Sequence, residues 1–153
     1  MKGGMAFGIV LAVVIGALLP LQALINARLG SLTNGPLYAA FVSFLVGTTL
    51  LAAVLLATRT PLLPSSGVAS LPAWIWLGGA IGALYVFAAT KLVPGLGAAA
   101  LICLVVLGQV TGSLLLDHYG VLGAKRPVDA MRVIGAVLVI AGVALVVRPW
   151  QAR

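Results

Sequence analysis

Five long apolar segments alternate along the chain with shorter segments that are polar or rich in Pro and Gly. A helix needs roughly 20 predominantly apolar residues to cross the hydrocarbon core of a bilayer. The pattern therefore predicts five transmembrane helices, at about residues 5–27, 37–57, 73–90, 98–117 and 129–147. We expect an all-α integral membrane protein in which residues 1–153 form a single five-helix domain.

Turn-forming residues separate the predicted helices. Residues 28–35 (RLGSLTNG) read as a short loop, after which Pro36 suits the first turn of the next helix. Residues 58–72 are rich in Pro and Ser and form a longer linker. Lys, Pro and Gly within residues 91–95 predict a tight hairpin between the third and fourth helices.

The first apolar segment follows Lys2 and could be mistaken for a secretory signal. No small-x-small cleavage site comes after it, so we expect an uncleaved first transmembrane helix. Pro20 lacks a backbone N–H group and should kink this helix near Gly16.

Five polar side chains lie inside the apolar segments. Gln22 and Asn26 are four residues apart and share a helix face, while Ser43, Tyr85 and Gln109 lie in the next three helices. A rise of about 1.5 Å per residue places Tyr85 and Gln109 near the middle of the bilayer. Because polar groups in lipid need partners, we expect all five to face protein or a wet cavity. Gln22 and Asn26 are explained equally well as a pair that bonds neighbouring helices.

The fourth apolar segment, within residues 95–123, carries a stripe of polar side chains. Gln109, Ser113 and Asp117 recur every four residues and therefore stack on one face. This makes the fourth helix the strongest candidate for a functional helix. The two ends of the stripe are expected at different depths in the membrane, with Gln109 near the middle and Asp117 at the edge.

Asp117 and the adjacent His118 are the candidates for a titratable coupling group. For Asp117 we favour a structural role, in which the carboxylate pairs with Arg132 or Lys125 and anchors the following loop. His118 has the same explanation as a residue at the membrane interface.

Composition supports the membrane assignment. Hydrophobic residues make up 63% of the chain and charged residues 7%, and the mean hydropathy is +1.25. A net charge of +7 would indicate nucleic acid binding in a soluble protein, but the basic residues stand mainly at the ends of apolar segments. There they serve as interfacial anchors, so we expect lipid and not nucleic acid as a partner.

Few side chains are available for catalysis or metal binding. The chain has one cysteine, Cys103, one histidine, two aspartates and no glutamate. This set is too small for an ordinary metal site within one protomer, for a disulfide or for a catalytic dyad. We predict no metal, no cofactor and no enzymatic activity.

The basic residues barely determine an orientation in the membrane. Five lie on the side of the N-terminus and four on the other side, namely Lys2, Arg59, Lys125, Arg126 and Arg132 against Arg28, Lys91, Arg148 and Arg153. A difference of one predicts dual insertion. Two oppositely inserted copies can form an antiparallel homodimer about a two-fold axis in the membrane plane, bringing Tyr85 and Gln109 near their symmetry mates. A paralogous half is the alternative partner.

Three groups of residues resemble a known family. They are Gln22 and Asn26 in the first helix; Ala39, Ser43, Phe44 and Gly47 in the second; and Gly108, Gln109, Asp117, His118 and Gly120 in the fourth. Over nearly its whole length the chain resembles the YdcZ-like branch of the drug/metabolite transporter superfamily. The resemblance implies a half-size protein of the bacterial cytoplasmic (inner) membrane, whose five helices correspond to one inverted repeat of ten-helix members. Two halves would make the working unit.

One feature of related four-helix multidrug exporters is missing. Those proteins use a first-helix glutamate to exchange protons for cationic drugs, and this chain has no acidic residue in its first helix. The remaining polar set favours a small neutral or zwitterionic metabolite or drug, bound by Gln22, Asn26, Ser43, Tyr85 and Gln109. We expect a secondary transporter with alternating access. A passive channel and a non-transporting assembly partner are the alternatives, and the substrate, transport direction and coupling ion stay open.

Overall fold

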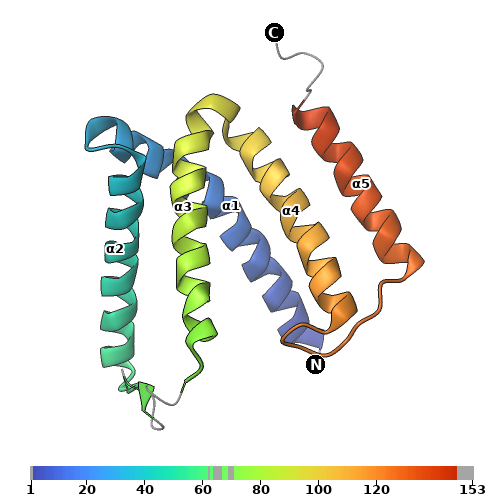
Figure 1. Cartoon of the computed structure of the whole chain (residues 1–153), viewed down its shortest axis with the longest axis horizontal. Helices are drawn as coiled ribbons and strands as arrows, with labels where there is room; N and C mark the ends of the chain where they lie inside the picture. The colour runs from blue at the N-terminus through green and yellow to red at the C-terminus, as the bar shows by residue number, and fades with distance from the viewer. Residues whose placement is uncertain (1, 62, 64–66, 69–70, 148–153) are drawn as a thin grey trace. The chain divides into compact units, whose positions relative to one another are not determined.

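The computed structural model describes residues 2–61, 63, 67–68 and 71–147. Its helices are α1 (Lys2–Leu32), α2 (Pro36–Ala57), the short 3₁₀ helix η2 (Ala73–Trp76), α3 (Leu77–Leu96), α4 (Ala98–Tyr119) and α5 (Ala130–Val147) (Figure 1). The described residues contain no strand, and five helical segments are long and apolar enough to cross a membrane. The all-α fold with five spanning helices is therefore confirmed.

Contacts between residues divide the chain into two compact units, Met1–Pro94 and Gly95–Arg153. The first unit contains α1, α2, η2 and nearly all of α3, and the second contains α4 and α5. The single five-helix domain stays a prediction. The binding candidates in the first three predicted spans belong to the first unit. Gln109, Asp117 and His118 belong to the second.

Small side chains hold the first unit together. α1 packs on α2, and Figure 1 shows α3 beside α2 with α1 crossing behind α3. Gly82 of α3 lies against the ring of Phe44 of α2, since a Cβ atom at Gly82 would be 3.5 Å from that ring. Small residues let helix backbones approach closely in lipid. The buried residues of this unit follow that rule and are Ala23, Asn26, Gly30, Ala39, Ala40, Ala89, Thr90 and Val93.

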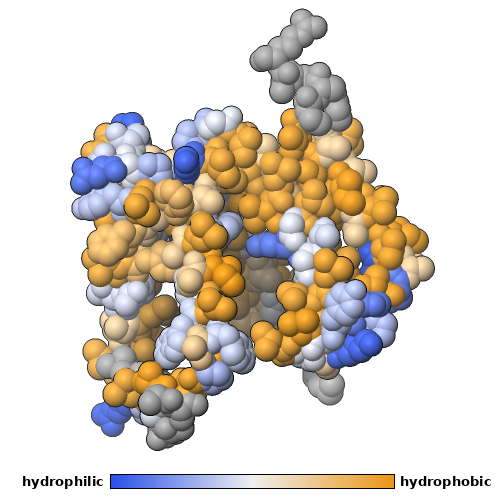
Figure 2. All heavy atoms as spheres, viewed as in Figure 1, coloured by the Kyte–Doolittle hydropathy of each residue, from blue (hydrophilic) through white to orange (hydrophobic). Residues whose placement is uncertain are grey.

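Most large apolar side chains lie on the outside of the helices. In the most apolar 18-residue window of each span, only 6 to 11% of the residues are buried. Figure 2 shows hydrophobic residues along the sides of the helices and hydrophilic residues gathered near helix ends. A lipid environment favours this distribution because the acyl chains contact apolar side chains while polar groups reach the headgroups.

α1 is longer than the sequence predicted, and the predicted loop at residues 28–35 is mostly helical. The helix continues to Leu32, because hydroxyl groups satisfy carbonyl groups in its last turn. The Oγ of Ser31 donates to the Arg28 carbonyl at 2.8 Å, and the Oγ1 of Thr33 donates to the Leu29 carbonyl at 2.7 Å. The chain reverses only at Gly35, whose φ of 97° favours glycine. The helix also passes through Pro20, and the kink near Gly16 stays a prediction.

α3 also exceeds its predicted end, and the hairpin predicted at residues 91–95 is wrong. The helix runs to Leu96 and contains Pro94. A proline this close to a helix end removes one hydrogen bond but leaves few residues beyond it to be disrupted. The left-handed conformation that separates α3 from α4 falls instead on Gly97, with φ 78°. Thr90, expected at the end of the span, therefore lies well inside the helix.

In the second unit, α4 and α5 pack on each other, and the loop between them is fastened to the end of α4. Gly120 ends α4 with a left-handed φ of 69°. The backbone N–H of Arg126 donates to the carbonyl of Asp117 at 2.8 Å. Farther along the loop, the backbone N–H of Val128 donates to Nδ1 of His118 at 3.3 Å. The loop is thus held in a defined conformation by groups of α4.

Gly120 provides a test of this loop. A Cβ atom at Gly120 would lie 3.1 Å from the Cβ and 3.2 Å from the Cα of Lys125, and a left-handed conformation costs other residues about 1–2 kcal/mol. We expect Gly120→Ala to lower the melting temperature in detergent micelles by several degrees. Gly123→Ala should have little effect, because Gly123 has open space around it and no left-handed φ. Equal losses in both variants would contradict the assignment.

Candidate functional site

Asn26 is a buried polar residue in the contact between α1 and α2. Its side chain is 5% exposed, and its Nδ2 donates to Oγ of Ser43 at 3.3 Å. An amide buried in an apolar helix contact is unfavourable without such a partner. This bond fits the first explanation that the sequence allowed for Asn26, bonding between helices, and a role for Asn26 in binding stays a prediction.

Gln22, one turn earlier on the same face of α1, differs from Asn26. Its side chain is exposed and makes no hydrogen bond with another described residue. It lines a small cavity against α3 and two wider grooves against α2. Gln22 is thus an amide with unused donors and acceptors at the junction of three adjoining hollows.

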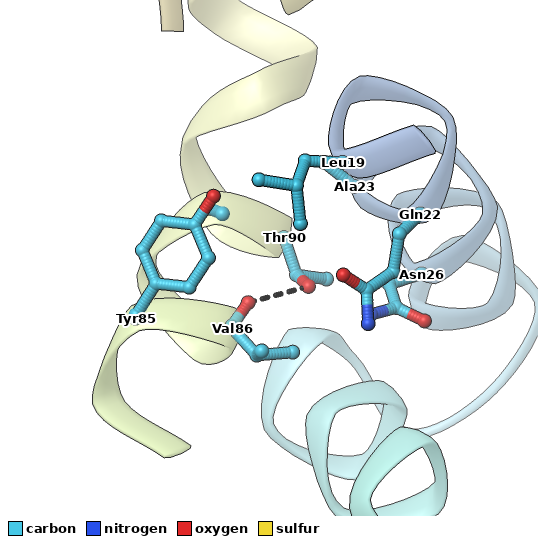
Figure 3. A pocket seen from close by; sticks show the side chains of 8 residues that line it. Leu19, Gln22, Ala23, Asn26, Tyr85, Val86 and Thr90 are labelled. Carbon is cyan, nitrogen blue, oxygen red and sulfur yellow. Dashed lines mark hydrogen bonds between the residues drawn. The ribbon is translucent and has the colours of Figure 1, made fainter. Parts of the chain in front are cut away.

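The small cavity lies between α1 and α3 and has a volume of about 10 Å³, close to the smallest that can hold one water molecule. Figure 3 shows the side chains of Gln22 and Asn26 projecting from α1 toward Thr90 of α3. Thr90 is 1% exposed, and its hydroxyl donates to the Val86 carbonyl at 2.7 Å. The residues that line the cavity are Leu19, Gln22, Ala23, Asn26, Tyr85, Val86, Ala89 and Thr90.

Two grooves extend this site along α2. One has a volume of about 390 Å³ and is lined mainly by apolar residues of α1 and α2, with Gln22, Asn26 and Ser43 as its polar members. The other, of about 340 Å³, is lined by Gln22, Ser43 and Thr48 among apolar neighbours. Mostly apolar hollows with a few polar groups are typical of small-molecule sites.

Tyr85 also belongs to this unit. It is half-buried, lines the small cavity and makes no hydrogen bond through its hydroxyl with another described residue. In Figure 3 its ring lies on the far side of Thr90 from the amides of Gln22 and Asn26. Four of the five predicted binding residues, Gln22, Asn26, Ser43 and Tyr85, therefore gather within the first unit.

Thr90 was missed by the sequence reasoning. It was placed at the predicted end of the third span, where a hydroxyl group needs no explanation. The only available signal was its position in a run of small residues, Ala88–Ala89–Thr90, which favours close helix packing. Because α3 continues to Leu96, Thr90 is instead a buried member of the site.

Two of the three residues of the predicted polar stripe of α4, Ser113 and Asp117, have partners within the second unit. The hydroxyl of Ser113 donates to the Val110 carbonyl at 3.0 Å, and that of Thr111 donates to the Leu107 carbonyl at 2.9 Å. Gln109 is exposed on α4 and makes no hydrogen bond with another described residue. Its role as a binding residue, and the depth it was expected to share with Tyr85, stay predictions.

Asp117 forms the ion pair expected with Arg132. The carboxylate lies 3.5 Å from a guanidinium nitrogen, and both side chains are partly exposed. Asp129 caps the start of α5, because its Oδ1 accepts the backbone N–H of Arg132 at 2.9 Å. The ring of His118 packs edge-on against that of Tyr119, with centroids 5.2 Å apart. These contacts fit an anchoring role for Asp117 and His118, and a coupling role stays untested.

The bond between Asn26 and Ser43 can be measured with a double-mutant cycle. Hydrogen bonds between membrane helices contribute roughly 0.6–2 kcal/mol. We expect Asn26→Ala and Ser43→Ala each to lower stability in micelles, and the double variant to lose less than the sum by about that amount. Pairing Asn26→Ala with Thr49→Ala is the control, because the Thr49 hydroxyl bonds its own helix at Leu45, 2.9 Å away. Additive losses for Asn26 and Ser43 would disprove the bond.

Comparison with known proteins identifies the family of this chain. A model of the family described as "Putative inner membrane exporter, YdcZ" matches residues 7–145. No curated protein and no solved structure matches the chain. The match extends from α1 to the last turns of α5 and identifies a multi-pass transporter of the inner membrane. The chain belongs to the YdcZ family of inner membrane exporters.

Proposed function

We propose that the protein is a secondary transporter whose first unit binds a small neutral or zwitterionic metabolite or drug. The observation that carries this proposal is the position of Gln22. Its amide has no partner among the described residues and lies where the small cavity and both grooves adjoin. The Gln22 amide can form hydrogen bonds with a substrate seated there, because no described protein group uses its donors and acceptors.

The chemistry of the lining favours a substrate without net charge. The described residues that line the cavity and the two grooves have amide, hydroxyl, phenol and apolar side chains, and none of them is charged. Both carboxylates of the chain, Asp117 and Asp129, belong to the second unit. An ion without a counter-charge is costly to remove from water. Amides and hydroxyls satisfy donors and acceptors of a neutral molecule, and a zwitterion can balance its own charges.

The proposed working unit is an antiparallel homodimer of oppositely inserted copies that alternates between inward-open and outward-open shapes. The support is the nearly even distribution of basic residues, five against four, and the half-size character implied by the family resemblance. Two of the nine, Arg148 and Arg153, lie outside the described residues. Pairing with a paralogous half is the alternative outcome.

The proposal can be tested with purified protein in liposomes. A thermal-shift screen of neutral, zwitterionic, cationic and anionic compounds first identifies ligands, and radiolabelled hits are then used in flux assays. We expect hits among the neutral and zwitterionic compounds, with saturable uptake and counterflow. Fast flux that rises linearly with concentration would establish a channel instead. Hits restricted to net-charged compounds would overturn the substrate class.

A further inference from the structure

A groove between α4 and α5 is separate from the site in the first unit. It has a volume of about 490 Å³ and opens along the second unit. Its apolar part is formed by Leu114, Leu115, Val133, Ala136, Val137 and Ile140, and its end near the α4–α5 loop by His118, Tyr119 and Val128. The groove thus has a long apolar part and a polar end.

Two cations of the α4–α5 loop, Lys125 and Arg126, form no ion pair with another described residue. The only carboxylate side chains of the chain are Asp117 and Asp129. Asp117 pairs with the guanidinium of Arg132, and Asp129 accepts the backbone N–H of Arg132. Lys125 and Arg126 are also exposed. Their charges are therefore available to an anion.

The loop conformation keeps these cations at the end of α4. The backbone N–H of Arg126 is bonded to the carbonyl of Asp117 at 2.8 Å. The backbone of Lys125 lies so close to Gly120 that a Cβ atom there would be 3.2 Å from the Cα of Lys125. Because His118 and Tyr119 belong to the same last turn of α4, the backbones of Lys125 and Arg126 lie near the polar end of the groove, although neither residue lines it.

His118 adds a hydrogen-bond donor. Its Nδ1 accepts the backbone N–H of Val128 at 3.3 Å, so the neutral ring carries its hydrogen on Nε2. Tyr119 is 72% exposed and contributes a hydroxyl group of the kind that favours the headgroup region of a bilayer. One end of the groove therefore has two hydrogen-bond donors, His118 and Tyr119, and lies near the loop that carries Lys125 and Arg126.

We propose that this groove binds an anionic phospholipid. Its acyl chain would occupy the apolar part of the groove, and its phosphate would lie near Lys125, Arg126 and His118. The positive charges of Lys125 and Arg126 favour an anionic headgroup over a zwitterionic one. The apolar part of the groove favours a lipid over free phosphate. This gives the residues Asp117, His118 and Gly120 a role in shaping the loop that is independent of transport.

The test is lipid binding to the full chain in detergent micelles, measured by native mass spectrometry with phosphatidylglycerol, phosphatidylcholine and inorganic phosphate. Two basic side chains near an anionic headgroup strengthen binding roughly thirtyfold. We expect about that preference for phosphatidylglycerol over phosphatidylcholine. The preference should disappear in a Lys125→Gln/Arg126→Gln double variant. Ala136→Phe, which fills the apolar part of the groove, should weaken binding of both lipids.

The matched control removes one Arg and one Lys elsewhere. Arg28 and Lys91 are exposed residues of the first unit, and Arg28→Gln/Lys91→Gln should keep the full preference. Equal binding of the two lipids to the native protein would overturn the proposal. So would a preference retained in Lys125→Gln/Arg126→Gln or lost equally in the control. Inorganic phosphate that competes with phosphatidylglycerol at similar concentration would assign the cations to a free anion instead.

Discussion

Replacing Gln22 by Leu should lower saturable counterflow in proteoliposomes by about 5- to 150-fold. A polar group left without its partner in a desolvated site costs about 1–3 kcal/mol, and each 1.4 kcal/mol corresponds to a factor of ten. Gln22 has no partner among the described residues, so the leucine removes no bond that stabilises the protein. The melting temperature in micelles and the yield of dimer should therefore stay unchanged, and only transport should suffer.

Two comparisons make this result specific. Thr49→Val removes a hydroxyl group that bonds its own helix and should leave counterflow unchanged. Asn26→Leu removes a buried amide that bonds Ser43 and should lower both counterflow and melting temperature. If Gln22→Leu behaves like Asn26→Leu, Gln22 is a structural residue. If it behaves like Thr49→Val, the substrate binds elsewhere, and Gln109→Leu becomes the next variant to measure.

The orientation of the protein should be mixed, and two substitutions should make it uniform. Reporter tags at the two termini are expected to detect comparable fractions of the protein in each compartment. The reason is that five basic residues lie on one side of the membrane and four on the other. Arg28→Gln/Lys91→Gln leaves five against two. This variant should place the N-terminus in the cytoplasm in nearly all molecules, and transport by a homodimer should then be lost.

The opposite substitution provides the control for orientation. Lys125→Gln/Arg126→Gln leaves three against four, so the majority orientation should reverse while both orientations persist. Full activity of a protein that is inserted in one orientation would contradict the antiparallel homodimer.

The number and type of the helices could be predicted from the sequence, because a spanning helix satisfies its own backbone and depends mainly on local composition. Pairing of Asp117 with a nearby cation could also be predicted, since few charges compete at that end of the membrane, but the sequence left Arg132 and Lys125 as alternatives and the structure shows Arg132. Helix ends were less predictable. The segment 28–35 has the composition of a loop, yet the hydroxyl groups of Ser31 and Thr33 bond carbonyl groups and extend α1.

The roles of the polar residues within the helices depended on the tertiary structure. Gln22 and Asn26 are equivalent in the sequence, as two amides on one helix face. Packing of α2 against α1 brings Ser43 to Asn26, whereas Gln22 lines the cavity and grooves without a partner among the described residues. Thr90 became a member of the site only because α3 continues past it. The sequence by itself determined that these groups lie in the membrane, whereas contacts between distant segments decided which of them are already bonded, because a hydrogen bond requires a partner within about 3 Å.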